Sequence, residues 1–169
     1  LSISWSFFYG LKKGGKMLAY QMIAPNEREN YLPYLRLADE EVGMIRRYLN
    51  DGQLYSIHLA GQSTVIGVMH VTFVDQTQVE LKNIALLPAY RNQGYGQQAL
   101  NDLKQMMVAQ GYRTLLVGTG DGSLAAIGFY LRQGFRFDHI RKNFFEQYQQ
   151  PIIENGIRLQ DMVVLSQPL

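Results

Sequence analysis

The chain has 169 residues, of which 47% are hydrophobic and 18% are charged, and this is the composition of one folded globular domain. A formal net charge of +2 is too small to indicate a nucleic-acid or membrane-surface partner, so we expect neither. There are no cysteines and the three histidines lack metal-ligand spacing, which excludes a Cys nucleophile and predicts no metal site.

Residues 1–16 differ in character from the rest of the chain. The stretch from Ile3 to Tyr9 is apolar and aromatic, but it is too short to span a bilayer and no basic segment precedes it. The lysine-rich run 12–16 stands directly before Met17 and would be encoded by purine-rich codons that resemble a bacterial ribosome-binding site. We therefore expect residues 1–16 to be a translated leader or a vector-derived segment. A genuine edge strand or dimer arm is the alternative.

The first half of residues 17–169 predicts an antiparallel meander. A strand at 17–24 stops at Pro25, and a short helix within 26–37 is interrupted near Pro33. Asp39 is expected to be the N-cap of a second helix that ends near residue 50. Three further strands are rich in β-branched and apolar residues and are joined by tight turns: 54–60, 64–74 and 78–87.

The second half changes to helical periodicity. Apolar residues predict a helix over about 94–110, followed by a buried strand at 114–119, a helix at 123–133 and a strand at 135–140. A last strand is expected at 157–165. A strand–helix–strand unit of this length implies a parallel crossover. The prediction is an α/β fold with a mixed central sheet, an antiparallel meander joined to a parallel βαβ half, and helices on both faces.

The motif Arg91-x-x-Gly94-x-Gly96 lies between a strand and a long amphipathic helix. Glycines there let the backbone turn sharply, and the helix start presents unpaired N–H donors and the positive end of the helix dipole. These features together predict a pyrophosphate site. No Gly-Lys-Ser/Thr follows, so a nucleoside triphosphatase loop is not expected.

This motif, after the strand end Ile84-Ala-Leu-Leu-Pro, resembles the acyl-CoA loop of the GNAT N-acetyltransferase superfamily. A second segment, 123–135, resembles the family's Asn-x-x-Ala-x-x-x-Tyr-x-x-x-Gly-Phe pattern, with Ser123 where Asn is usual. The run 154–162 is similar to a bacterial subgroup of unassigned substrate. The resemblance implies one GNAT domain over 17–169, with a sheet that splays between its fourth and fifth strands.

The resemblance also implies acetyl-CoA as cosubstrate. The free backbone groups of the strand near Ile84 and Leu86 would bind the pantetheine arm, and the N–H of Leu86 would face the thioester carbonyl. The Arg91 side chain and the backbone of the following loop would hold the pyrophosphate. The expected cofactor-binding residues are Ile84, Ala85, Leu86, Arg91, Asn92, Gln93, Gly94, Tyr95, Gly96, Gln97, Ser123 and Tyr130.

Two residues are expected to be catalytic. Tyr130 would protonate the departing sulfur of coenzyme A, with simple core packing as the alternative. A lysine-type ammonium has a pKa of about 10.4 and must lose a proton before it attacks. Glu80 is the predicted base, on the strand that carries the thioester. The alternatives are a Glu80 carboxylate merely paired with Lys82, and His70 as the base.

The predicted reaction is transfer of an acetyl group to a primary amine by direct attack, without a covalent enzyme intermediate. The acceptor would be a small-molecule or peptide amine, and the loop 144–148 and Glu154 are expected to border its site, because aromatic and acidic residues suit a cationic amine. The alternative is a non-catalytic acyl-CoA sensor or scaffold. The resemblance also implies a cytoplasmic protein that is able to form a homodimer.

Overall fold

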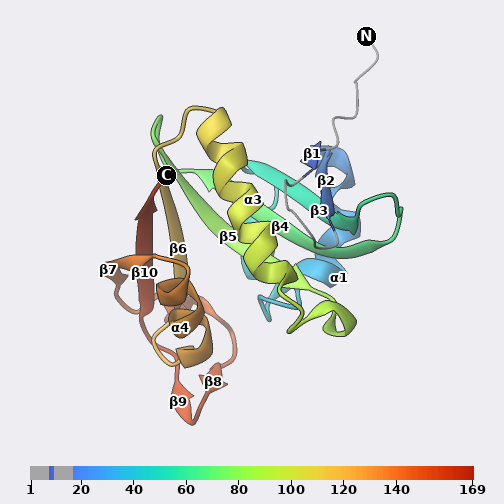
Figure 1. Cartoon of the computed structure of the whole chain (residues 1–169). Helices are drawn as coiled ribbons and strands as arrows, with labels where there is room; N and C mark the ends of the chain where they lie inside the picture. Colours follow the sequence, from blue (N-terminus) through green and yellow to red (C-terminus); the bar gives the residue numbers. More distant parts are fainter. Residues whose placement is uncertain (1–7, 10–16) are drawn as a thin grey trace.

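The computed structural model describes Phe8–Tyr9 and residues 17–169, which form an eight-stranded mixed sheet flanked by helices (Figure 1). The sheet strands are β1 (Phe8–Tyr9), β2 (Leu18–Ile23), β3 (Gln53–Leu59), β4 (Val65–Phe73), β5 (Gln78–Leu86), β6 (Thr114–Gly120), β7 (Arg136–Arg141) and β10 (Met162–Pro168). The helices are a 3-10 helix (Pro25–Tyr31), α1 (Leu32–Leu35), α2 (Val42–Tyr48), α3 (Tyr95–Ala109) and α4 (Leu124–Arg132), with short 3-10 turns at Pro88–Tyr90 and Phe144–Gln147. A separate hairpin consists of β8 (Ile153–Glu154) and β9 (Ile157–Arg158).

The strand order is β1-β2-β3-β4-β5-β6-β10-β7, and β5 and β6 are the one parallel pair among these strands. The predicted meander is confirmed, since β2 to β5 pair antiparallel in chain order. The predicted parallel crossover is also confirmed, because α3 connects β5 to β6. The second crossover differs from expectation: β10 inserts between β6 and β7 and pairs antiparallel with both.

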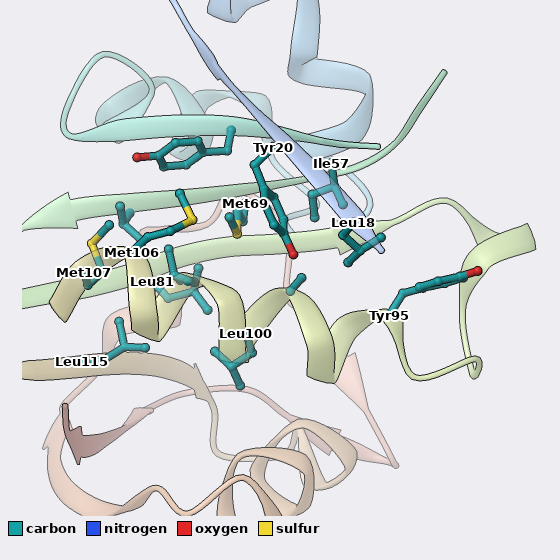
Figure 2. Close-up of a cluster of buried hydrophobic side chains, with 14 of the residues drawn as sticks. Leu18, Tyr20, Ile57, Met69, Leu81, Tyr95, Leu100, Met106, Met107 and Leu115 are labelled. Carbon is teal, nitrogen blue, oxygen red and sulfur yellow. The ribbon is translucent and has the colours of Figure 1, made fainter. Parts of the chain in front are cut away.

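Helices cover both faces of the sheet, as predicted. On one face, α3 lies across the central strands and contributes Leu100, Leu103 and Met107 to the larger core (Figures 1 and 2). Phe135 and the partly buried Tyr130 extend this core toward α4. On the other face, the 3-10 helix, α1 and α2 cover a smaller cluster of Ile23, Leu35, Ile45, Leu49, Leu54, Val68 and Ala85.

Three boundaries differ from those expected from sequence. The helix predicted to start at Asp39 begins at Val42, although the Asp39 carboxylate does accept a hydrogen bond from the Glu41 backbone N–H at 3.3 Å. Pro33 lies in the first turn of α1 and so starts that helix, after the preceding 3-10 turn. The single strand predicted at 157–165 is two strands, β9 and β10, with a turn between them.

The prediction about residues 1–16 falls largely outside the described residues. Within that segment, Phe8–Tyr9 form an antiparallel edge pair with Tyr20 and Ala19 of β2. A leader or vector-derived origin therefore stays a prediction. Over the described part of the chain, no helix is long and apolar enough to cross a membrane.

Candidate active site

The sheet parts between β5 and β6, which are the fourth and fifth strands of the domain predicted at 17–169. The resemblance implied a splay at this place. The two strands pair only from Gln78 opposite Thr114 to Leu81 opposite Val117. Beyond that point β5 continues to Leu86 and β6 to Gly120 without pairing to each other. The backbone edges of both strands are therefore turned toward a gap at their carboxyl ends.

The register with β4 shows which backbone groups of β5 face this gap. Leu87 N–H donates to the carbonyl of Ile66 at 2.8 Å, so that pair is hydrogen-bonded across the sheet. Because hydrogen-bonded and non-hydrogen-bonded pairs alternate in an antiparallel ladder, Leu86 opposite Gly67 is non-hydrogen-bonded, as is Ile84 two residues earlier. The N–H and C=O groups of Ile84 and Leu86 therefore point away from β4, toward β6. Ala85 instead turns its side chain into the core under α1 and α2.

The start of α3 lies just beyond this gap. Gly94 is the N-cap residue, with a left-handed φ of 83°, and no side chain caps the helix. Asn92 is also left-handed, at φ 57°. Gln98 N–H bonds to the Gly94 carbonyl at 3.0 Å, so the preceding N–H groups at the first turn, from Tyr95 to Gln97, lack helical acceptors. This is the geometry of an anion site at a helix N-terminus.

The side chains around that helix start have separate roles. Arg91 donates from Nε to the Leu86 carbonyl at 3.0 Å, which ties the loop to the end of β5 and leaves the terminal guanidinium nitrogens available. Gln93 donates to the Ala89 carbonyl at 2.7 Å. Tyr95 is buried in the core beneath α3, so its side chain anchors the helix start.

Tyr130 lies on α4 and packs edge-to-face against Phe129 and Phe135, at ring-centroid distances of 5.3 and 5.5 Å. Burial alone raises the pKa of Tyr130 to about 12, so the phenol stays protonated at neutral pH and is able to donate. Ser123, at the N-cap of the same helix, is buried and makes no side-chain cap hydrogen bond. Both the packing role and the donor role of Tyr130 are consistent with this placement.

A β-bulge shapes β5 beside the gap. Leu81 pairs with Val71 and Asn83 with His70, so Lys82 is an extra residue without a partner on β4. A bulge bends the strand and changes the direction of its side chains. As a result Lys82 and Asn83 lie on the same face of the sheet, toward α1 and α2, while Leu81 packs into the core beneath α3.

A cavity of about 970 Å³ lies on that face. Glu80, Leu81 and Lys82 line it from β5, and 118–120 line it from β6, so its inner end meets the gap between the strands. Its other walls include the segment 36–40, part of α2, the residues 50–52, Ser123 and Ala126 at the start of α4, and residues 144, 145, 147 and 148 together with Glu154. The loop 144–148 and Glu154 were expected beside the acceptor site; Glu154 and every residue of the loop except Glu146 line this cavity.

Glu80 is buried at the inner end of the cavity and is ion-paired. Arg141 donates from its two terminal nitrogens to the two carboxylate oxygens at 2.8 and 2.9 Å, and Lys82 Nζ lies 3.4 Å from Oε1. Burial opposes ionisation, but the hydrogen bonds and the charges of Arg141 and Lys82 outweigh it and hold the pKa of Glu80 below its usual value. The geometry therefore favours the alternative of a paired carboxylate, and the base role stays a prediction.

His70 is poorly suited to act as the base. Its side chain is fully buried and does not line the cavity. Nε2 is 2.7 Å from the Asp51 carbonyl, which makes Nε2 the protonated nitrogen. Burial lowers the pKa of His70 to about 4, so the ring is neutral, and it packs against Tyr48 at a centroid distance of 5.2 Å.

Asp39 is a site residue that sequence reasoning took for a helix cap alone. Its carboxylate lines the cavity and accepts hydrogen bonds from the hydroxyls of Tyr148 at 3.2 Å and Tyr48 at 3.5 Å. Burial raises the pKa of Asp39 despite these hydrogen bonds. Asp39 precedes a helix, as an N-cap would, so no local sequence pattern marked it as a cavity residue.

The segment 144–149 crosses the cavity and is tied to the opposite wall at three points. Besides Tyr148 to Asp39, Gln149 N–H donates to Glu41 Oε2 at 2.8 Å, and Arg47 donates to Gln147 Oε1 at 2.7 Å. We call this segment the aromatic strap, because its rings at 144, 145 and 148 pack against one another. No group of acidic and histidine side chains among the described residues has the arrangement of a metal site.

Known proteins share this architecture. The family model described as Acetyltransferase (GNAT) family matches residues 16–135. The uncharacterized N-acetyltransferase YvbK of Bacillus subtilis (strain 168) is 32% identical over 132 residues, which are 78% of this chain and 84% of that protein.

Two of the solved structures that are similar over 90% of this chain contain a bound ligand of the same kind. One is a GNAT family acetyltransferase from Elizabethkingia anophelis with acetyl-CoA bound, at a TM-score of 0.81 and 35% identity, covering 98% of that chain. The other is a Bacillus subtilis acetyltransferase in complex with CoA, at a TM-score of 0.76 and 29% identity, covering 99% of that chain. With the family model matching well over half of its length, the chain belongs to the acetyltransferase (GNAT) family.

Proposed function

We propose that this protein is an N-acetyltransferase that transfers an acetyl group from acetyl-CoA to a primary amine by direct attack. The observation that carries the proposal is the gap between β5 and β6, where the backbone groups of Ile84 and Leu86 are turned away from β4, next to the uncapped start of α3. Two similar structures contain acetyl-CoA or CoA, which supports the same ligand here.

The residues of this chain fit the two ends of such a ligand. N–H groups from Tyr95 to Gln97 and the terminal nitrogens of Arg91 are free to bind a diphosphate, and charge at a partly buried helix start contributes up to about 2 kcal/mol. The N–H and C=O groups of Ile84 and the N–H of Leu86 would pair with the amides of pantetheine as an added strand does, while the Leu86 carbonyl stays bonded to Arg91. We assign the Leu86 N–H to the thioester oxygen, where negative charge develops.

Acetyl-CoA would supply the acetyl group as a thioester. The amine nitrogen forms a bond to the acetyl carbon, the carbon–sulfur bond breaks, and Tyr130 donates its proton to the departing sulfur. Its raised pKa keeps the phenol protonated until a thiolate is formed. Ser123 lies seven positions earlier, at the N-cap of the same helix, where we expect it to contact the ligand.

The amine must also lose a proton, and we propose that Glu80 accepts it. Glu80 lies six residues before Leu86 on β5, about 20 Å along an extended strand, so the proton would reach it through a chain of water molecules in the cavity. The low pKa of Glu80 makes it a weak base for a free ammonium. Arg141 and Lys82 bring two positive charges to this one carboxylate, so an amine bound there is disfavoured in its protonated form. We therefore propose that the amine binds neutral and loses its proton after the new bond forms, when the nitrogen is far more acidic.

A thiol-release assay with acetyl-CoA and a panel of primary amines tests this proposal, with coenzyme A binding measured by thermal shift. Amine-dependent thiol release is the expected result, together with a coenzyme A-dependent rise in melting temperature. Coenzyme A binding without thiol release for any amine would instead indicate a sensor or scaffold. A melting temperature that coenzyme A leaves unchanged would contradict both functions.

A further inference from the structure

The cavity on the α1–α2 face has chemically different ends. Its inner end, beside the gap, holds Glu80 between the cations Lys82 and Arg141, so this end carries one more positive than negative charge. Its outer end is formed by Asp39, Tyr48 and the aromatic strap. Tyr48 stands between the ends: its hydroxyl bonds to Asp39, while Lys82 Nζ lies 5.7 Å from its ring centroid.

The carboxylate of Asp39 has no cationic partner. Its hydrogen bonds come from two neutral hydroxyls and one backbone N–H, at distances of 3.2 to 3.5 Å, and no basic side chain within 8–9 and 17–169 forms an ion pair with it. A half-buried anion without a counter-charge is costly, and a bound cation would remove that cost. Glu80, by contrast, is already neutralised by its two partners.

The aromatic strap adds a second feature that suits a cation. Phe145 and Tyr148 stack at a centroid distance of 5.4 Å, and Tyr148 is the residue whose hydroxyl reaches Asp39. Aromatic faces attract alkylammonium groups through their negative quadrupole. The outer end of the cavity thus combines a carboxylate that has no cationic partner with aromatic rings, one of which is hydrogen-bonded to it.

We propose that Asp39 and the aromatic strap bind a second positive charge on the acceptor, one that lies away from the reacting amine. This inference rests on the proposed function and names the substrate class of the same site: amines that carry a second cationic group, such as aliphatic diamines. The polarity of the cavity orients such an acceptor. Its ammonium end lies at Asp39, and its neutral amine lies at the inner end beside Lys82, where the cavity meets the gap between β5 and β6.

Other charged groups near the outer end do not change this assignment. Arg36 and Arg47 line the cavity and keep their positive charges, since Gln147, the partner of Arg47, is neutral; both side chains are exposed, where water screens them. Glu40 and Glu154 line the cavity but are exposed, where water screens their charges. Among the described acidic side chains that line this end, Asp39 is therefore the one that is half-buried and without an ion-pair partner; Glu41 is also half-buried, but it does not line the cavity and its carboxylate accepts the Gln149 N–H.

The test compares kcat/KM for 1,4-diaminobutane and for butylamine, which differ in the second amine. The wild-type protein is expected to prefer the diamine by on the order of tenfold, equivalent to about 1.4 kcal/mol. Asp39→Asn keeps the shape and the hydrogen-bonding oxygen but removes the charge, and it is expected to abolish the preference. Asp39→Glu, which restores the charge, is expected to recover part of it.

Glu40→Gln is the matched control, because it removes a neighbouring exposed carboxylate and should leave the preference intact. Folding of each variant is checked by the coenzyme A-dependent thermal shift. Equal kcat/KM for the two amines in the wild type would overturn the inference while leaving acetyl transfer established. A preference that survives Asp39→Asn would also overturn it. Absence of thiol release with every amine would overturn the proposed function itself.

Discussion

Replacing Glu80 by glutamine removes the anion that holds two cations at the inner end of the cavity. Glu80 is 7% exposed in its side chain and receives two charge-assisted hydrogen bonds from Arg141. Breaking one partner of a buried ion pair costs about 3 to 5 kcal/mol. The side chains of Arg141 and Lys82 are 29% and 21% exposed and can be partly rehydrated. We therefore expect Glu80→Gln to lower the free energy of unfolding at pH 7 by about 3 kcal/mol, the lower end of that range.

The pH dependence gives this prediction a second readout. The pKa of Glu80 is lower in the folded protein than in the unfolded chain, where it is about 4.3. The stabilisation is therefore complete above the unfolded pKa and is lost as the pH falls through the folded pKa. The difference between the wild type and Glu80→Gln should be largest near neutral pH and should shrink below about pH 4.

Urea denaturation followed by circular dichroism, repeated between pH 3 and pH 7, measures both effects. Glu29→Gln is the matched control, because it breaks an exposed pair with Arg46 whose side chains are both 57% exposed, and no measurable loss is expected. A Glu80→Gln variant as stable as the wild type at pH 7 would refute the reasoning. A difference that stays constant down to pH 3 would show that the ion pair does not cause it.

Three further substitutions test other parts of the account. Tyr130→Phe is expected to lower kcat at least a hundredfold without changing the KM for acetyl-CoA. An unchanged kcat would show that Tyr130 only packs in the core and does not donate a proton. Gly94→Ala places a side chain at φ 83°, a backbone conformation that costs about 1 to 2 kcal/mol for a residue with a side chain. We therefore expect the variant to bind coenzyme A more weakly in calorimetry. Wild-type affinity would show that the start of α3 does not contact coenzyme A. Tyr20→Phe deletes a hydrogen bond of 2.6 Å to the buried Asp102 and should lower the free energy of unfolding by about 1 to 3 kcal/mol in urea; a loss well under 1 kcal/mol would contradict this.

Most of the fold follows from local patterns in the sequence. Alternating β-branched residues, helical periodicity and turn residues mark the meander, the crossover and α3 to within a few residues. The insertion of β10 between β6 and β7 is not local, because pairing of a C-terminal strand is decided by which sheet edge is left open. The same holds for the turn before Met162, which is fixed by hydrogen bonds from Gln160 and Asp161 to the distant Asp121 carboxylate.

The sequence allowed us to predict the parts of the site that consist of backbone groups. It did not allow us to predict which side chains would pair with one another. The glycine motif identified the start of α3, and the strand before it identified the free edge of β5. The bulge is visible in the sequence, because the apolar positions of β5 change phase from 79 and 81 to 84 and 86. Arg141, the main partner of Glu80, lies 61 positions away and is marked by no local pattern. Asp39 and Tyr148 are 109 positions apart, so their contact depends on the path of the strap across the cavity.

We propose that acetyl-CoA binds between the parted strands β5 and β6 and at the start of α3. A crystal structure of the protein with acetyl-CoA measures this directly through the distance from the Leu86 nitrogen to the thioester oxygen. We predict a hydrogen bond there, with the diphosphate against the N–H groups of Tyr95 to Gln97. A ligand bound outside the gap, or a thioester remote from Leu86, would contradict the account.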